Sequence, residues 1–108
     1  MTSIKRIKLM PDYECWPLWD MDNLGDIDPD VLPISSSLKK NIDKWRGKYD
    51  STLNWDDPAS SGFQSNEEER NFVEQGWEIF HKLQEELPDI EIIPHGYLFE
   101  KYPNKSNK

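Results

Sequence analysis

Cysteine and long apolar stretches are scarce in this sequence. Cys15 is the single cysteine among 108 residues, which excludes an intramolecular disulfide, and a domain of this size without disulfides fits a reducing compartment. No run approaches the roughly 18 apolar residues that a transmembrane helix needs. Residues 1–8 include three basic side chains, but no apolar segment follows them, so we expect no signal peptide. These features predict a cytoplasmic protein.

Basic residues are in the minority too. Lysine and arginine total 13 against 21 aspartates and glutamates, which gives a formal net charge of −8. This charge repels phosphate backbones, so direct binding of nucleic acid is not expected. It favours solubility and attracts basic partners.

Aliphatic residues are few, and aromatic residues compensate for them. Hydrophobic residues make up 35% of the chain, but five Trp, four Tyr and four Phe supply a large buried area per residue. The length suits one domain and is too short for two with full cores. We expect a single domain over residues 1–102 and a polar, frayed tail over residues 103–108.

Hydrophobic patterning predicts an α+β domain. Residues 4–9 and 13–19 resemble strands, the second limited by Pro17 to a sheet edge. The segment 20–33 is expected to be a loop, and residues 90–93 a short strand. Two helices are expected, near residues 37–53 and 66–87. The order strand-strand-helix-helix-strand predicts a small antiparallel sheet of about three strands packed against two helices.

The two predicted helices carry clear apolar stripes and caps. In the first, any of Ser35 to Ser37 can cap the start. The second opens with a capping box, Ser65 followed by Glu68, and Pro88 ends it. Gly76 lies on its apolar stripe, where it allows close approach by a neighbour. The expected core between helices and sheet consists of Trp45, Tyr49, Phe72, Val73, Trp77, Phe80 and Leu83.

One acidic loop invites comparison with a calcium-binding loop. An EF-hand loop needs oxygen ligands at positions one, three and five, Gly at six and Glu at twelve. Asp20, Asp22 and Gly25 match three of these, but Leu24 and Val31 stand where two ligands are required. No helix-loop-helix frame surrounds the loop. We therefore expect no metal site, and interpret the segment as a solvated acidic loop or a partner surface.

The sequence contains few of the residue arrangements that catalysis requires. Asp56 and Asp57 are adjacent carboxylates, but neighbours in sequence usually point apart, and the Asp-Pro that follows is typical of a turn. His81 and His95 have no His or Cys at metal-ligand spacing. Cys15 between aromatic residues suggests a buried apolar thiol. No glycine-rich phosphate loop or nucleophile elbow is present, so we expect neither enzymatic activity nor a cofactor.

Charge segregation is the most informative feature. Seven acids and no base lie between Met10 and Ser37, and six more acids without a base lie between Tyr49 and Glu69. Such runs are often solvated faces, but both include aromatic residues that can anchor a partner steered by charge. The expected partner-binding residues are Asp20, Asp22, Asp26, Asp28, Asp30, Trp55, Asp56, Asp57, Phe63, Glu67 and Glu68. The two acidic loops border elements that should pack together, so they could lie on one side of the domain.

Two segments together resemble a known protein family. They are residues 13–20 (YECWPLWD) and 49–63 (YDSTLNWDDPASSGF). The likeness extends from Tyr13 to about Leu87 and is to small bacterial proteins that include immunity proteins of contact-dependent growth inhibition and related polymorphic toxin systems. The resemblance implies a protein that binds the C-terminal toxin domain of a cognate exoprotein in the cytoplasm and blocks it.

The resemblance also implies the chemistry of the partner. Many such toxins are nucleases, for example tRNases, and surfaces that grip phosphates are basic, so an acidic inhibitor fits them. The resemblance implies no catalytic residue. The alternative left open is an acidic adaptor or regulatory protein that binds a basic cellular protein.

Overall fold

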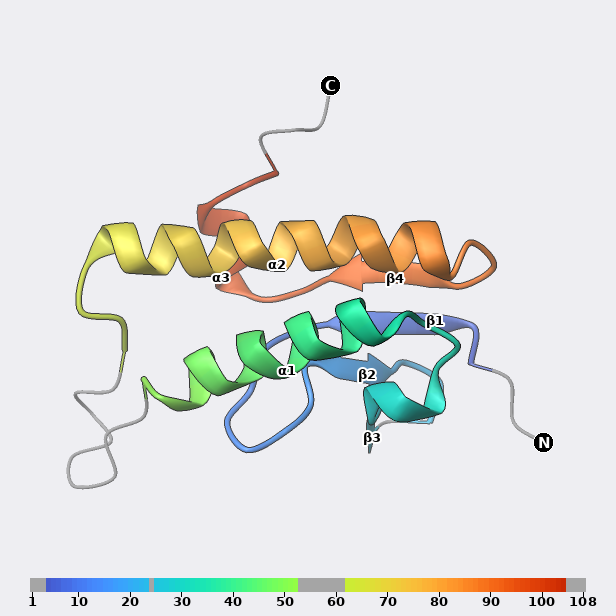
Figure 1. The fold of residues 1–108 in the computed structure, drawn as a ribbon. Coiled ribbons are helices and arrows are strands. Elements are labelled where there is room, and N and C mark those ends of the chain that lie inside the picture. Colours follow the sequence, from blue (N-terminus) through green and yellow to red (C-terminus); the bar gives the residue numbers. More distant parts are fainter. Residues whose placement is uncertain (1–3, 24, 53–61, 105–108) are drawn as a thin grey trace.

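The computed structural model describes residues 4–23, 25–52 and 62–104 (Figure 1). The fold class is α+β, as predicted: a mixed sheet is covered on one face by two long antiparallel helices. The elements, in chain order, are β1 (Arg6–Leu9), β2 (Leu18–Asp20), β3 (Gly25–Asp26), the short 3₁₀ helix η1 (Pro29–Val31), α1 (Ser36–Asp50), α2 (Asn66–Glu86), β4 (Glu91–Pro94) and α3 (Tyr97–Lys101).

The sheet differs from the prediction in strand number and direction. It has four strands in the order β3-β2-β1-β4, where about three antiparallel strands were predicted. β1 pairs with β4 in parallel, and the other pairs are antiparallel. The reason lies in the helix pair: α2 returns the chain to the start of β1, where the amide of Glu91 donates to the carbonyl of Lys5. β4 therefore begins at the same end as β1 and must run in the same direction.

The second strand is also shorter than predicted. Residues 13–16 form a turn instead of extended chain, and β2 begins only after Pro17, which is buried. Glu14 has a φ of +59°, in the left-handed region that ends a strand. The predicted loop 20–33 contains β3 and η1, which are too short to give a periodic pattern.

The long helices lie where the sequence predicts them. Ser35 caps α1 by accepting from the amide of Leu38 at 3.1 Å, and Ser65 caps α2 by accepting from Glu68 at 3.1 Å. α1 ends at Asp50, earlier than predicted, because the hydroxyls of Ser51 and Thr52 donate to the carbonyls of Lys48 and Tyr49. Within the described ranges, no helix is both long enough and apolar enough to cross a membrane.

Gly76 allows a close approach, as predicted. A Cβ at this position would lie 2.6 Å from Cζ2 of Trp45 and 3.1 Å from the ring of Phe99. The Trp45 ring stacks on Phe72 at 4.6 Å between ring centroids, and its Nε1 donates to the Phe72 carbonyl at 2.7 Å. The bare backbone of Gly76 thus makes room for the largest buried side chain.

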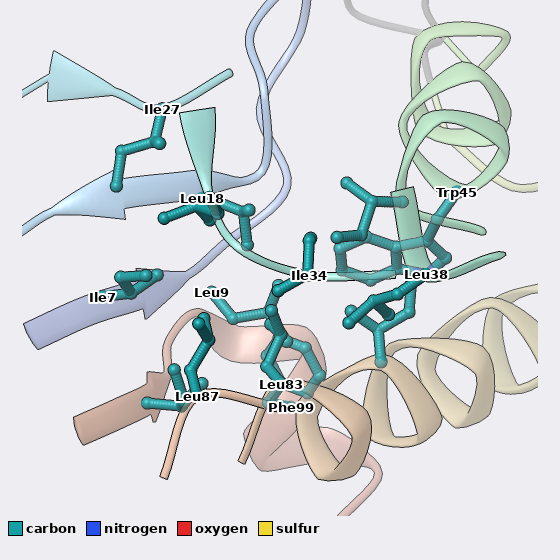
Figure 2. Close-up of a cluster of buried hydrophobic side chains, with 14 of the residues drawn as sticks. Ile7, Leu9, Leu18, Ile27, Ile34, Leu38, Trp45, Leu83, Leu87 and Phe99 are labelled. Carbon is teal, nitrogen blue, oxygen red and sulfur yellow. The ribbon is translucent and has the colours of Figure 1, made fainter. Parts of the chain in front are cut away.

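The core lies between the sheet and the helices (Figure 2). Of the predicted core residues, Trp45, Phe72, Val73 and Leu83 are buried, whereas Tyr49, Trp77 and Phe80 are half-buried and pack against the core. Trp77 faces α3, an element the sequence did not predict: its ring meets Phe99 edge-on at 4.9 Å, and its Nε1 donates to the Tyr102 carbonyl at 2.8 Å. The final segment is therefore held against α2 at least as far as Tyr102.

Candidate partner-binding surface

The first predicted acid, Asp20, holds the β2–β3 turn. Its carboxylate accepts from the amides of Asp22 and Asn23 at 2.9 and 3.2 Å and from the Asn23 side chain at 3.0 Å. These bonds, with the one from the Asn23 side chain largest, keep the pKa of Asp20 below its ordinary value. Asp20 is therefore a negative charge in a fixed position.

Three of the predicted acids border one open hollow beside β3 and η1. The hollow has a volume of about 340 Å³ and is lined by Ile4, Asp20, Asn23, Gly25, Asp26, Ile27, Asp28 and Val31. Asp26 accepts from the amide of Trp16 at 3.0 Å, and Asp28 caps η1 by accepting from the amide of Asp30 at 2.9 Å. The carboxylates of Asp20, Asp26 and Asp28 are thus ordered by backbone amides around a shallow, partly apolar surface.

The other two predicted acids of this segment have basic neighbours. Asp22 pairs with Arg6 at 2.7 Å, which raises the pKa of the arginine, and Asp30 lies 3.7 Å from Lys39. Such exposed pairs add little stability, but they reduce the negative potential at those two positions. The charge that a partner would encounter here comes chiefly from the three acids of the hollow.

Glu67 and Glu68 belong to the first turn of α2, and Phe63 precedes it; the start of α2 lies at the opposite end of the molecule from η1 and β3 (Figure 1). Asp30 adjoins the start of α1, whereas α2 begins beyond the end of α1. The 15 residues of α1 span about 22 Å, which separates the two acidic groups. Glu67 and Glu68 are exposed, while Phe63 is half-buried against Phe72, with 5.1 Å between the two ring centroids. The structure therefore separates the acids of the hollow from Glu67 and Glu68.

Three further predicted site residues, Trp55, Asp56 and Asp57, lie outside the described residues. Among the residues that are described, no three His, Cys, Asp or Glu side chains gather as metal ligands. The expected absence of a metal site stays a prediction.

The other residues that the sequence analysis considered for chemistry are Cys15, His81 and His95. Cys15 is half-buried, and burial, followed by the nearby carboxylates of Asp12 and Asp26, raises the pKa of its thiol. A thiol held neutral is a poor nucleophile. His81 is within hydrogen-bond distance of the Asn104 side chain, with Nε2 and Nδ2 2.9 Å apart, and His95 is exposed.

Sequence reasoning missed a second set of carboxylates, Asp12, Glu14 and Asp50. The amide of Glu14 donates to Asp50 Oδ1 at 2.8 Å across 36 positions of sequence, which joins the β1–β2 connection to the end of α1. Burial, reinforced by the neighbouring groups of Tyr13, Tyr97 and Asp12, raises the pKa of Tyr49 to about 12. The acids themselves are visible in the sequence, but only the tertiary contact shows that they meet.

Two comparisons with known proteins bear on the chain. Residues 5–94 match a family model described as Serratia CdiI immunity protein-like. No curated protein matches the chain. The matched region contains the four strands and both long helices of the described residues, together with the lining of the acidic hollow apart from Ile4.

Proposed function

Because this chain belongs to the Serratia CdiI immunity protein-like family, we propose that it binds the toxin domain of a cognate contact-dependent growth inhibition system and neutralises it. The family match, which extends over residues 5–94, is the observation that carries the proposal. Immunity proteins of this kind act by binding, so catalysis by this chain is not expected.

The proposed partner is a basic toxin domain, for example a nuclease such as a tRNase, that is met in the cytoplasm. The net charge of −8 supports this proposal, since a protein that grips phosphates presents a basic surface. Opposite net charges accelerate association and suppress encounters with acidic proteins.

Within this proposal the acidic hollow steers the toxin. Asp20, Asp26 and Asp28 accept hydrogen bonds from backbone amides, so their negative charges stand in fixed positions before a partner arrives. A surface that is already ordered loses less conformational entropy on binding than mobile side chains do. The hollow is shallow and open, which suits an encounter surface better than a deep anchoring pocket.

The test is the association rate with the cognate toxin domain. The Asp26→Asn/Asp28→Asn variant removes two charges but keeps the oxygens that accept the amides of Trp16 and Asp30. We expect the association rate constant at low salt to fall by about three- to tenfold, with convergence of the rates at high salt. A matched control, Glu74→Gln/Asp89→Asn, removes two exposed charges elsewhere.

Equal rates for the two variants would contradict a steering role for the hollow. Absence of binding by the parent chain would contradict the proposed function itself. Binding that is equally tight to unrelated basic proteins would favour the acidic adaptor instead.

A further inference from the structure

Three tyrosines from distant segments of the sequence lie near the β1–β2 connection and the end of α1. Tyr13 belongs to the β1–β2 connection, Tyr49 to the last turn of α1, and Tyr97 to the start of α3 (Figure 1). The rings of Tyr13 and Tyr49 stack with centroids 4.6 Å apart. Gly96, the residue before Tyr97, packs against Met10 where the β1–β2 connection begins, since a Cβ on Gly96 would lie 3.9 Å from Met10 Cγ. We call Tyr13, Tyr49 and Tyr97 the tyrosine patch.

In the tyrosine patch, Tyr13 and Tyr49 are held by contacts with the rest of the fold, whereas Tyr97 is exposed. The hydroxyl of Tyr13 lies 3.1 Å from Oγ1 of Thr52. The ring of Tyr49 packs on the core residue Phe72, with 5.7 Å between the two ring centroids. Tyr97, by contrast, is 69% exposed, and it shares that value with Val31 as the most exposed large hydrophobic residues described. An exposed tyrosine beside fixed rings is typical of an interface anchor, because the ring buries a large area with few rotatable bonds.

Uncompensated carboxylates surround this patch. Asp12 accepts from the amide of Tyr13 at 2.8 Å, and Asp50 from that of Glu14. Within residues 4–23, 25–52 and 62–104, none of Asp12, Glu14 and Asp50 forms an ion pair. In α1, Arg46 is already paired with Asp43 at 2.8 Å and lies over the ring of Trp16 at 4.1 Å, and Lys48 donates to the Gln75 side chain.

We propose that the tyrosine patch is the anchor on which a basic segment of the toxin domain is buried, with an arginine side chain placed over the Tyr97 ring. This inference rests on the proposed function and names the part of the chain that holds the partner. A guanidinium group packs on aromatic faces and pairs with carboxylates, so rings bordered by Asp12, Glu14 and Asp50 suit it on both counts. The hollow then governs how fast the complex forms, and the patch governs how long it lasts.

Dissociation kinetics with the purified toxin domain test this division. Tyr97→Ala should raise the dissociation rate constant by about 30-fold or more, the range of an interface hot spot, and change the association rate by less than about threefold. Glu74→Ala, at an exposed position of α2 outside both the hollow and the tyrosine patch, is the control, and its dissociation rate should stay within about threefold of the parent. Tyr97→Phe keeps the ring and should retain most of the complex lifetime. Because Tyr97 is exposed, these variants should fold like the parent.

The outcomes separate the two proposals. If the parent binds and Tyr97→Ala dissociates at the parent rate, the patch is not the anchor, while the proposed function stands. If the parent chain does not bind the toxin domain, the proposed function fails and this inference fails with it.

Discussion

At the scale of single residues, Glu69 is the carboxylate most clearly tied into the fold. It accepts from Lys101 Nζ at 2.8 Å and from the Tyr102 hydroxyl at 2.9 Å, which attaches α3 to the start of α2. The bond from Lys101, reinforced by the one from Tyr102, lowers the pKa of Glu69 against the opposing effect of burial. The ionised carboxylate is therefore the form that stabilises the native state.

The sign of the pH dependence follows from that shift. Because the pKa is lower in the folded than in the unfolded state, the stabilisation is present above the ordinary glutamate pKa of about 4.3 and is lost as the pH falls through the folded value. In the parent, the urea concentration at the midpoint of unfolding should fall between about pH 5 and pH 3. We expect it to fall less over this range in Glu69→Gln. Glu74→Gln, at an exposed position of the same helix, is the control. Parallel curves for Glu69→Gln and the parent would contradict this account.

At the scale of secondary-structure elements, two glycines in helices give opposite predictions. Gly76→Ala places a Cβ 2.6 Å from a Trp45 ring that Phe72 prevents from moving, so we expect a loss of about 1–3 kcal/mol in the free energy of unfolding. Gly47→Ala, in α1, meets no atom within 4 Å and should gain up to about 1 kcal/mol from helix propensity. Chemical denaturation of both variants measures the difference. Equal effects would mean that α1, α2 and α3 do not approach as described.

The two long helices and the strands β1 and β4 were predictable from sequence, whereas β3, η1 and α3 were not. α1 and α2 have caps and several turns of apolar periodicity, which local physical chemistry dictates. β3 has two residues and α3 has five, so neither repeats a pattern often enough to be recognised. The parallel pairing of β4 with β1 depends on where α2 ends in space, which no local signal specifies. The sequence placed Trp77 in the core between helices and sheet because α3, the element against which Trp77 packs, was not predicted.

At the scale of the whole molecule, the predicted site is divided by the length of α1. Composition drew attention to acidic segments that contain aromatic residues, but it could not show that Asp22 and Asp30 have basic neighbours. It also could not show that Asp12, Glu14 and Asp50 form no ion pair within the described part of the chain, because pairing depends on side chains brought together by folding. The resemblance to immunity proteins is confirmed by the family match over residues 5–94.

The central claim is that this chain neutralises one cognate toxin by binding it. The most direct measurement is growth of bacteria that produce the cognate toxin domain, with and without this chain in the same cells. A non-cognate toxin domain of the same growth-inhibition type serves as the specificity control. The account predicts restored growth against the cognate toxin and continued arrest by the non-cognate one. Continued arrest by the cognate toxin, in cells that contain abundant folded chain, would contradict it.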